Sequence, residues 1–278
     1  MELNKELERM QRNSIVLKIA RSEKYKLCGT RFGGKPDLPP GFEWPYFEGV
    51  NCENIVRKRP LSFLAQFNCE ELTQYDTEHL LPDHGMLSFF YETDTQCWGF
   101  DPKDKGCARV FWFEDLSVLK AASFPEDAGE DFEFPMTKIK MSQKSSFPSV
   151  QDLAEIVPNI EDELDNDDDE EDDELESCSK LLGWADIIQN SMAAQCDLVS
   201  QGYYLGGGND WRRVPKDIRK RAEETALDRW TLLLQLDTVE NGDFELMFGD
   251  CGRIYFYITK EDLLAHNFDK VWLVLQCY

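Results

Sequence analysis

The sequence contains very little histidine. Only three of its 278 residues are histidines: His79 and His84 lie five positions apart, and His266 is far away along the chain. A histidine metal centre needs imidazoles at ligand spacing, and Pro82 prevents a single helix from presenting the first two together. We therefore predict no metal site.

The sequence also has no hydrophobic run long enough to cross a bilayer. Its first residues, MELNKELERMQRNS, are too charged for a signal peptide. The nine cysteines are scattered and never spaced as CxxC, which disfavours a disulfide framework or a zinc ribbon. We expect reduced thiols, no membrane contact and a cytoplasmic location.

Basic residues are scarce relative to acidic ones. The chain has 30 Lys and Arg against 54 Asp and Glu, which gives a formal net charge of -24. Such a charge repels phosphate backbones and anionic membrane surfaces, so we expect no nucleic-acid partner.

Half of that negative charge lies in one segment, because twelve of the fourteen residues from Glu161 to Glu174 are acidic. Self-repulsion and the lack of apolar side chains predict a disordered insert over 158–178. Two alternatives stay open. The segment could recruit a basic partner, or Asp165, Asp167, Asp169 and Glu176 could form a Ca²⁺ loop, although Glu170 replaces the glycine that such a loop needs.

Signature motifs of common enzymes are absent: there is no GxSxG, HExxH, dinucleotide-binding or kinase pattern. Gly33-Gly34 is not followed by the Lys-Ser/Thr of a phosphate-binding loop, and Gly206-Gly207-Gly208 lacks a strand-to-helix setting. We therefore predict no catalytic residue and no cofactor.

Two similar stretches stand in the two halves of the chain. LSFLAQFN and DHGMLSFF (residues 61–68 and 83–90) resemble WTLLLQLD and DCGRIYFY (230–237 and 250–257). The match aligns Gln66 with Gln235 and Asp83 with Asp250. A repeat of about half the chain length predicts a duplicated domain rather than a solenoid.

Short apolar and aromatic runs separated by turns predict strands in a largely antiparallel sheet. The expected strands are 61–68, 86–91, 108–113, 230–236, 245–248, 253–258 and 271–276, with a hairpin turn at Asn241-Gly242. Helices are predicted over 3–22, 149–157 and 215–226, and after Thr259, which begins a capping-box pattern. The fold class is therefore α+β, with an internally duplicated antiparallel sheet and peripheral helices.

A candidate binding site follows from the repeat and from the loop FGGKPDLPPGFEWPYFEG (32–49). Glutamine amides could hold a peptide backbone while aromatic residues hold its side chains. The candidate residues are Trp44, Tyr46, Gln66, Gln235, Asp83 and Asp250. The glutamines and aspartates could instead serve only to satisfy loop backbones.

Segments along both halves resemble a family, including FGGKPDLPPGFEWP, PLSFLAQFN, LPDHGMLSFF, LLGWADIIQ and MFGDCGRIYFYI. They resemble the uncharacterised proteins typified by bacterial YwqG (DUF1963), over roughly residues 28–278. The resemblance implies a mixed α+β duplication in which Gly183 and Asp186 match Gly34 and Asp37. It also implies a remote relationship to the programmed-cell-death-2 and ribosome-maturation proteins, and thus a chaperone or peptide-binding role, although their zinc-finger insertion has no counterpart here.

The chain is therefore expected to form one domain over 1–278, with similar halves at about 28–120 and 180–278. The leading hypothesis is a non-enzymatic, possibly chaperone-like protein that holds a protein or peptide between the halves. One alternative is a cofactor-independent enzyme that uses Asp237, Glu245 or Asp250. The other is a scaffold whose acidic segment recruits a basic partner.

Overall fold

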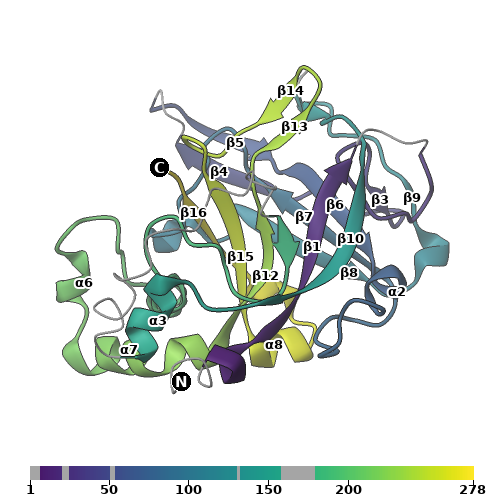
Figure 1. The fold of residues 1–278 in the computed structure, drawn as a ribbon. Coiled ribbons are helices and arrows are strands. Elements are labelled where there is room, and N and C mark those ends of the chain that lie inside the picture. Colours follow the sequence, from purple (N-terminus) through teal and green to yellow (C-terminus); the bar gives the residue numbers. More distant parts are fainter. Residues whose placement is uncertain (1–6, 21–24, 51–53, 130–131, 158–178) are drawn as a thin grey trace.

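A computed structural model of the chain describes residues 7–20, 25–50, 54–129, 132–157 and 179–278. The predicted acidic insert over 158–178 lies outside these residues. The centre of the molecule is a ten-stranded sheet that curls around a hydrophobic core (Figure 1). In spatial order its strands are β16 (Trp272–Gln276), β15 (Arg253–Thr259), β12 (Trp230–Leu236), β11 (Lys180–Leu181), β1 (Arg12–Ala20), β10 (Thr137–Ser146), β2 (Arg31–Phe32), β6 (Ser62–Asn68), β7 (Met86–Tyr91) and β8 (Ala108–Phe113).

Every strand pair described in this sheet is antiparallel, as the turn-separated apolar runs predict. Strands β7, β8 and β12 have the predicted bounds, and β6, β15 and β16 differ by one residue at one end. The mixed α+β class with a largely antiparallel sheet is thus confirmed. Three small two-stranded sheets lie beside the main one: β3 (Asp37–Leu38) with β9 (Lys120–Ala121), β4 (Tyr46–Val50) with β5 (Val56–Pro60), and β13 (Val239–Asn241) with β14 (Phe244–Leu246).

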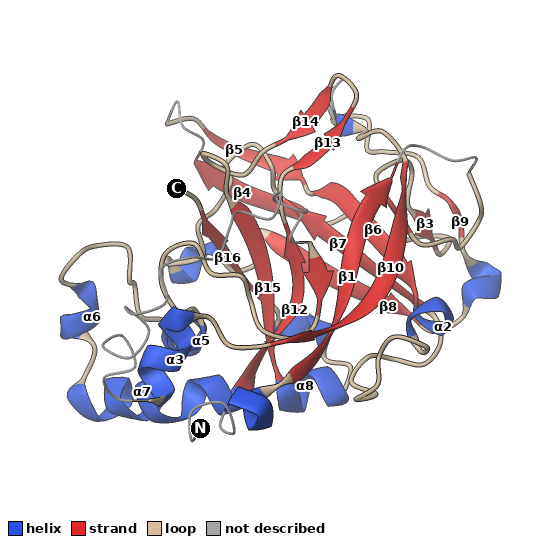
Figure 2. Cartoon of the chain, in the orientation of Figure 1, coloured by secondary structure: helices blue, strands red, loops and turns tan. Residues whose placement is uncertain are grey.

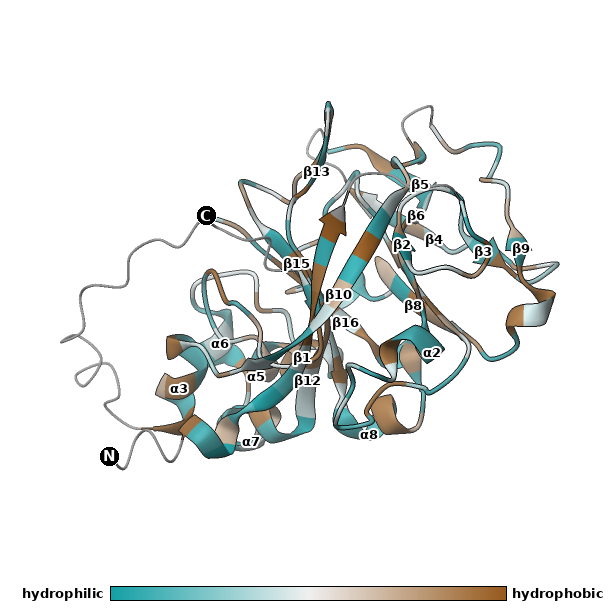
Figure 3. Ribbon diagram, turned by 45° about the vertical axis from the view of Figure 1, so that its right-hand side comes forward, coloured by the Kyte–Doolittle hydropathy of each residue, from teal (hydrophilic) through white to brown (hydrophobic). Residues whose placement is uncertain are grey.

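The N-terminal segment is a strand and not the predicted helix. Helical structure is limited to residues 7–10 of the described part of this segment, and β1 begins at Arg12. Ile15 and Leu17 are buried and alternate with Val16 and Lys18, which is the two-residue period of a strand. Figure 3 shows the same alternation of hydrophilic and hydrophobic residues along β1 and β10. The helical spacing of the apolar residues therefore ends before Arg12, where the alternation of the strand begins.

Helices gather mainly against the second half of the sheet (Figure 2). The predicted helices near 149–157 and 215–226 form as α3 (Val150–Ile156) and α7 (Lys216–Arg229). The capping residue Thr259 begins α8 as predicted, and its hydroxyl accepts a hydrogen bond from the Asp262 amide at 3.1 Å. The remaining helical elements are α2 (Cys69–Leu72), α5 (Ala193–Ser200), α6 (Asp210–Arg213), η1 (Pro102–Asp104), η2 (Leu116–Val118) and η4 (Phe268–Lys270). Within the described residues, none of the helices has the length and apolar character needed to cross a membrane.

The strand order reads the same way outward from the central pair β1 and β10. One side continues through β11, β12, β15 and β16, and the other continues through β2, β6, β7 and β8. The register of β6 on β7 shifts between Phe63 and Ala65, and that of β12 on β15 shifts between Leu232 and Leu234. Each shift lies just before the aligned glutamine, so the two sides share a local irregularity as well as an order.

Three apolar clusters hold the layers together. The largest fills the inside of the curled sheet, where Phe89 of β7 meets Phe256 of β15 with ring centroids 5.3 Å apart. A second cluster packs α5 and α7 on the outer face of β12, β15 and β16. The third packs Leu38, Phe42 and Trp44 on the outer face of β6 and β7. The glycine- and proline-rich loop after β2 therefore covers the outer face of β6 and β7, as α5 and α7 cover the outer face of β12, β15 and β16.

One close contact near the sheet edge requires glycine. Gly99 has φ +82°, and its carbonyl accepts a hydrogen bond from Trp272 Nε1 at 2.8 Å. A Cβ atom there would overlap the backbone carbonyl of Leu273 in β16. We predict that Gly99→Ala lowers the free energy of unfolding by at least ~3 kcal/mol, from unfavourable φ and from displaced backbone.

Gly106→Ala is the matched control for this measurement by urea denaturation. Gly106 has φ +95°, but a Cβ there would meet nothing within 4 Å. Gly106→Ala should therefore lower the free energy of unfolding only by the conformational strain of the left-handed backbone, ~1–2 kcal/mol. Equal decreases in the free energy of unfolding of the two variants would contradict the prediction, because they would show that β16 can move away from the added Cβ atom at little cost.

Candidate functional site

Both predicted glutamines lie in the interior, each paired with an aspartate. Gln66 Nε2 donates to Asp37 Oδ2 at 2.7 Å, and Gln66 Oε1 accepts from the Asp37 amide at 3.0 Å. Gln235 makes the same two bonds with Asp186, both at 2.8 Å. Neither glutamine has any exposed surface. Their contact with a partner stays a prediction, since in this structure their amides tie a loop to a strand.

A buried cation completes each pair. Arg31 Nη1 lies 2.9 Å from Asp37 Oδ2, and Lys180 Nζ lies 2.7 Å from Asp186 Oδ2. Burial raises the pKa of Asp37, but hydrogen bonds from Arg31 and Tyr25, together with the Arg31 charge, outweigh burial and hold that pKa below its usual value. Burial and the hydrogen bond to Asp37 raise the pKa of Tyr25 to about 12.

The two aromatic candidates have different surroundings. Trp44 is half-buried, donates from Nε1 to the Leu61 carbonyl at 2.9 Å and packs edge-on against Phe90. Tyr46 is 37% exposed, and its hydroxyl donates to Asp127 Oδ1 at 2.7 Å. Trp44 thus packs the loop onto the sheet, whereas Tyr46 has surface available for contact.

The two aspartates of the repeat are exposed and lie far apart. Asp83 follows β6 and Asp250 follows β12. Five successive antiparallel pairings separate β6 from β12, so these strands run in opposite directions and end at opposite ends of the sheet. The six candidate residues therefore do not line one common cleft.

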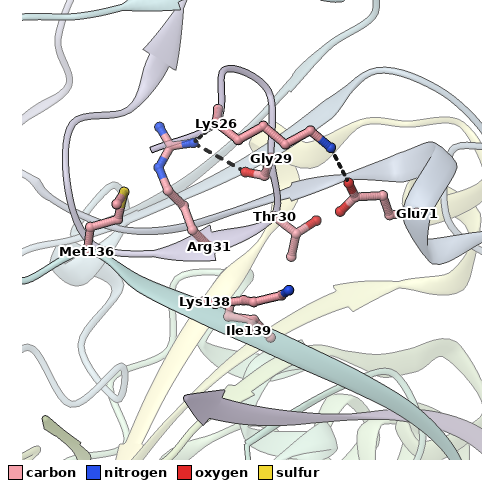
Figure 4. Close-up of a pocket in the computed structure, with 8 residues that line it drawn as sticks. All are labelled: Lys26, Gly29, Thr30, Arg31, Glu71, Met136, Lys138 and Ile139. Atoms are coloured by element: carbon pink, nitrogen blue, oxygen red, sulfur yellow. Dashed lines mark hydrogen bonds and ion pairs between the residues drawn. The ribbon is translucent and has the colours of Figure 1, made fainter. Parts of the chain in front are cut away.

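A first pocket, here called the Arg31 pocket, opens beside the Gln66 pair (Figure 4). Its volume is about 160 Å³. Lys26 extends to Glu71 with a 3.5 Å ion pair, and Arg31 is 4% exposed, with its Nε lacking a hydrogen-bond partner. The lining residues are Lys26, Gly29, Thr30, Arg31, Glu71, Met136, Lys138 and Ile139. Three of the lining side chains are cationic and one is acidic, but Arg31 is already paired with Asp37 and Lys26 with Glu71.

A second pocket, here called the His266 pocket, lies beyond α2 and has a volume of about 350 Å³. The connection from β6 to β7 supplies all but one of its lining residues, and the turn after α8 supplies His266. Asp76 is 3% exposed; its Oδ2 accepts from the Leu81 amide at 2.8 Å, whereas Oδ1 has no partner. The lining residues are Leu72, Thr73, Asp76, His79, Leu81, Pro82, Asp83 and His266.

All three histidines of the chain gather at this pocket, which the sequence spacing did not suggest. His79 and His266 line it, and His84 follows the lining residue Asp83. The Trp112 ring lies edge-on between His84 and His266, at 5.5 and 4.5 Å between centroids. A 2.6 Å hydrogen bond between His84 Nδ1 and Asp83 Oδ1 raises the pKa of His84 and lowers the pKa of Asp83. Only the curled sheet, which brings η4 beside β8, joins these distant segments.

Both lining histidines have backbone conformations that favour glycine. His79 has φ +52° and His266 has φ +56°. His266 follows the last residues of α8, where the Asn267 amide bonds to the Asp262 carbonyl at 2.7 Å and the His266 amide bonds to that of Leu263 at 3.0 Å. This is the Schellman helix end, whose left-handed position usually holds glycine. Such residues often cluster at functional sites.

Metal coordination finds no support in the described part of the chain, where no group of three or more His, Cys, Asp or Glu has the arrangement to hold an ion. The cysteines described, Cys28, Cys69, Cys97, Cys107, Cys196, Cys251 and Cys277, are free. The side chains that line the two pockets can take part in charge pairing, hydrogen bonding and apolar contact.

The lowered pKa of Asp37 sets a pH dependence. Ionised Asp37 stabilises the fold above the unfolded-state pKa of ~4, and this contribution is lost as pH falls through the lower folded-state value. We predict that Asp37→Asn lowers the free energy of unfolding by ~3–5 kcal/mol at pH 7, because Arg31 loses its buried partner. The loss should shrink below pH 4 in denaturation curves. Asp186→Asn, with a side chain that is 43% exposed, should cost less, and equal losses would contradict this account.

His266→Gly should leave stability within ~1 kcal/mol of the wild type. Relief of the left-handed strain, ~1–2 kcal/mol, offsets the lost ring contact with Trp112, ~0.5–1.5 kcal/mol. Ala265→Gly is the control: Ala265 has φ -85° and gains nothing from glycine, so it should cost ~0.5–1 kcal/mol. Urea denaturation measures both, and a loss above ~2 kcal/mol for His266→Gly would mean that the ring is needed by the fold.

Comparison with curated proteins found no match to the chain. A family model described as a domain of unknown function, DUF1963, matches residues 30–277. This range includes every strand of the ten-stranded sheet except β1, all lining residues of the His266 pocket, and those of the Arg31 pocket except Lys26 and Gly29. The chain is a member of the DUF1963 family.

Proposed function

We propose that the chain is a non-enzymatic, chaperone-like binding protein that holds a protein or peptide at the His266 pocket, between the two halves of the sheet. The observation that carries this proposal is the pocket itself. Residues from the first half and His266 from the second line one cavity, and one of these lining residues, Asp76, has a buried carboxylate oxygen without a hydrogen-bond partner. A cavity of ~300 Å³ or more with a few polar groups is typical of ligand sites.

The opposite end of the sheet has a junction equivalent to the one at the His266 pocket, and comparing the two supports a binding role for the pocket. There the connection from β12 to β15 meets the connection from β7 to β8, which mirrors the junction at the His266 pocket. Gln96 links the two connections at that junction: its Nε2 donates to the Met247 carbonyl at 3.1 Å, and its Oε1 accepts from the Gly249 amide at 2.8 Å. The two equivalent junctions therefore differ in their side-chain contacts.

An extended peptide suits the surface around α2. Glu71 lines the Arg31 pocket, and the next two residues, Leu72 and Thr73, line the His266 pocket. Two cavities of opposite character thus flank one short helix. A peptide lying across α2 could place an anionic group in one and a different side chain in the other, which supports a peptide over a compact small molecule.

We further propose that the two halves arose by internal duplication. The shared strand order, the matching register shifts and the repeated glutamine–aspartate–cation groups support this interpretation. On this view the binding pocket developed in a connection that differs between the copies, while the paired loops were kept.

The enzyme alternative receives less support. Neither pocket is lined by Asp237, Glu245 or Asp250. Asp237 lies 3.2 Å from Arg253 in an ion pair, and Glu245 and Asp250 are exposed. The scaffold alternative concerns residues outside the described part of the chain.

Display panning with a matched pair of variants tests the binding proposal. Thr73 is exposed and lines the His266 pocket, so Thr73→Trp should fill it. Gln74 is also exposed but does not line the pocket, so Gln74→Trp adds the same ring outside it. We expect peptides enriched on the wild type to bind Gln74→Trp within twofold and to lose at least tenfold in affinity for Thr73→Trp. The proposal fails if no peptide is enriched, or if every enriched peptide binds the two variants equally.

A further inference from the structure

We infer that a row of lysines on the outer face of β1 and β10 is the docking surface of the chain's own acidic segment, Glu161–Glu174. These two central strands contain five basic residues and no acidic residue, in a chain with 54 acidic and 30 basic residues. The row, here called the lysine stripe, consists of Lys18, Lys138, Lys140 and Lys144. Such a basic surface on an acidic protein has the charge that complements an anionic occupant. The inference concerns a different surface from the His266 pocket and does not depend on the proposed function.

All four lysines lie on one face of the sheet. Lys18 is directly opposite Lys140 in the register of β1 on β10, and the three β10 lysines are an even number of residues apart. The four side chains are exposed, whereas the neighbouring Leu17 and Ile139 are buried in the core inside the sheet. Like charges directly opposite each other destabilise an antiparallel pair. A counter-charge above the lysine stripe would therefore stabilise the two central strands.

The strand topology brings the acidic segment to this side of the sheet. Strands β10 and β11 each pair antiparallel with β1, so they run parallel to each other, with β1 between them. Parallel strands of one sheet are joined by a crossover along one of its faces. The hydrophobic core fills the inner face, so this connection lies on the outer side, where the lysine stripe is. It begins with α3, at the end of the sheet where β1 starts and β10 ends (Figure 1).

The two ends of the connection set how far its acidic residues are from the stripe. β10 ends at Ser146, opposite the first residue of β1, whereas the chain returns to the sheet at Ser179, whose carbonyl accepts from the Leu17 amide at 2.8 Å. Glu174 precedes Ser179 by five residues, which span at most ~18 Å when fully extended. The acidic segment thus ends close to Lys18, the residue after Leu17.

This tether favours the chain's own segment over a separate acidic molecule. A charged group held by a short linker has an effective concentration in the millimolar range, well above that of most free partners. The basic residues of α6 and α7 are the main competing surface, but there acids are interspersed: Arg213 pairs with Asp210 at 2.6 Å, and Lys220 with Glu224 at 3.5 Å. The lysine stripe has no acid within its own strands and is the better match.

The first test compares amide NMR signals of the full wild-type chain with those of a variant in which every Asp and Glu from 161 to 174 is replaced by Asn or Gln. We expect the signals of Lys18, Lys140 and Lys144 to differ between the two proteins, and those of Lys216 and Lys220 in α7 to stay unchanged. Raising the salt concentration of the wild type from 150 mM to 1 M should move the same three signals toward their positions in the neutralised variant, because salt screens exposed charges.

The second test adds a synthetic peptide of residues 161–174 to the neutralised variant. The peptide should restore the wild-type signals saturably. In the same background, Lys140→Gln combined with Lys144→Gln should weaken peptide binding at least tenfold. Lys216→Gln combined with Lys220→Gln removes the same charge from α7 and should change peptide binding by less than twofold.

Unchanged stripe signals on neutralisation of the segment would overturn the inference without reference to any lysine variant. Stripe signals that shift toward those of the neutralised variant on dilution of the wild type would overturn it as well, because they would place the segment on a second copy of the chain. So would a peptide that moves the stripe signals of the wild type as readily as those of the neutralised variant, because the stripe would then be open to other acidic chains. Equal loss of peptide binding in the two double variants would show that general charge, and not the stripe, attracts the peptide.

Discussion

The reciprocal bond between a buried glutamine and an aspartate is the constraint on which both flanks of this fold depend. A side-chain amide in the interior needs its donors and acceptor satisfied. Gln66 achieves this with the Gly29 carbonyl at 3.0 Å and with the side chain and amide of Asp37. Asp37 in turn holds Arg31, whose guanidinium bonds to backbone carbonyls of the same loop. One strand residue thus fixes the loop that forms the wall of the Arg31 pocket.

The second half uses the same device with different details. Gln235 holds Asp186, and the Asp186 carbonyl also accepts from the Tyr255 hydroxyl at 2.8 Å and from Arg253 at 3.1 Å. Lysine replaces arginine as the cation, at Lys180. The connections beyond these loops differ between the two sides. The β6–β7 connection lines a pocket, whereas Gln96 of the β7–β8 connection bonds to the backbone of the β12–β15 connection at the far end of the sheet.

Sequence reasoning predicted the sheet well because apolar runs and turn residues are local signals. It also singled out Gln66 and Gln235, whose role in binding stays a prediction, and the family resemblance aligned Asp186 with Asp37. It did not connect each glutamine with its aspartate, because 29 and 49 residues separate the partners and only the paired strands join them. Asp83 and Asp250, which sequence analysis placed with the glutamines in one binding site, lie at opposite ends of the sheet. The start of β1 was missed because helical spacing before Arg12 hid the alternation around Ile15.

The pocket at His266 could not be predicted for a related reason, since no local pattern marks a residue that meets its neighbours only when a sheet curls. The structure shows a difference in the hydrogen bonding of buried polar groups at different places in the fold. At Gln66 every buried donor and acceptor is paired, whereas Arg31 Nε and Asp76 Oδ1 are each left unpaired beside a cavity. Two histidines at the second cavity also hold left-handed backbone that glycine would hold at less cost. At this cavity an unpaired carboxylate oxygen and two residues with left-handed backbone occur together, and that coincidence is the physical reason to look for a ligand there.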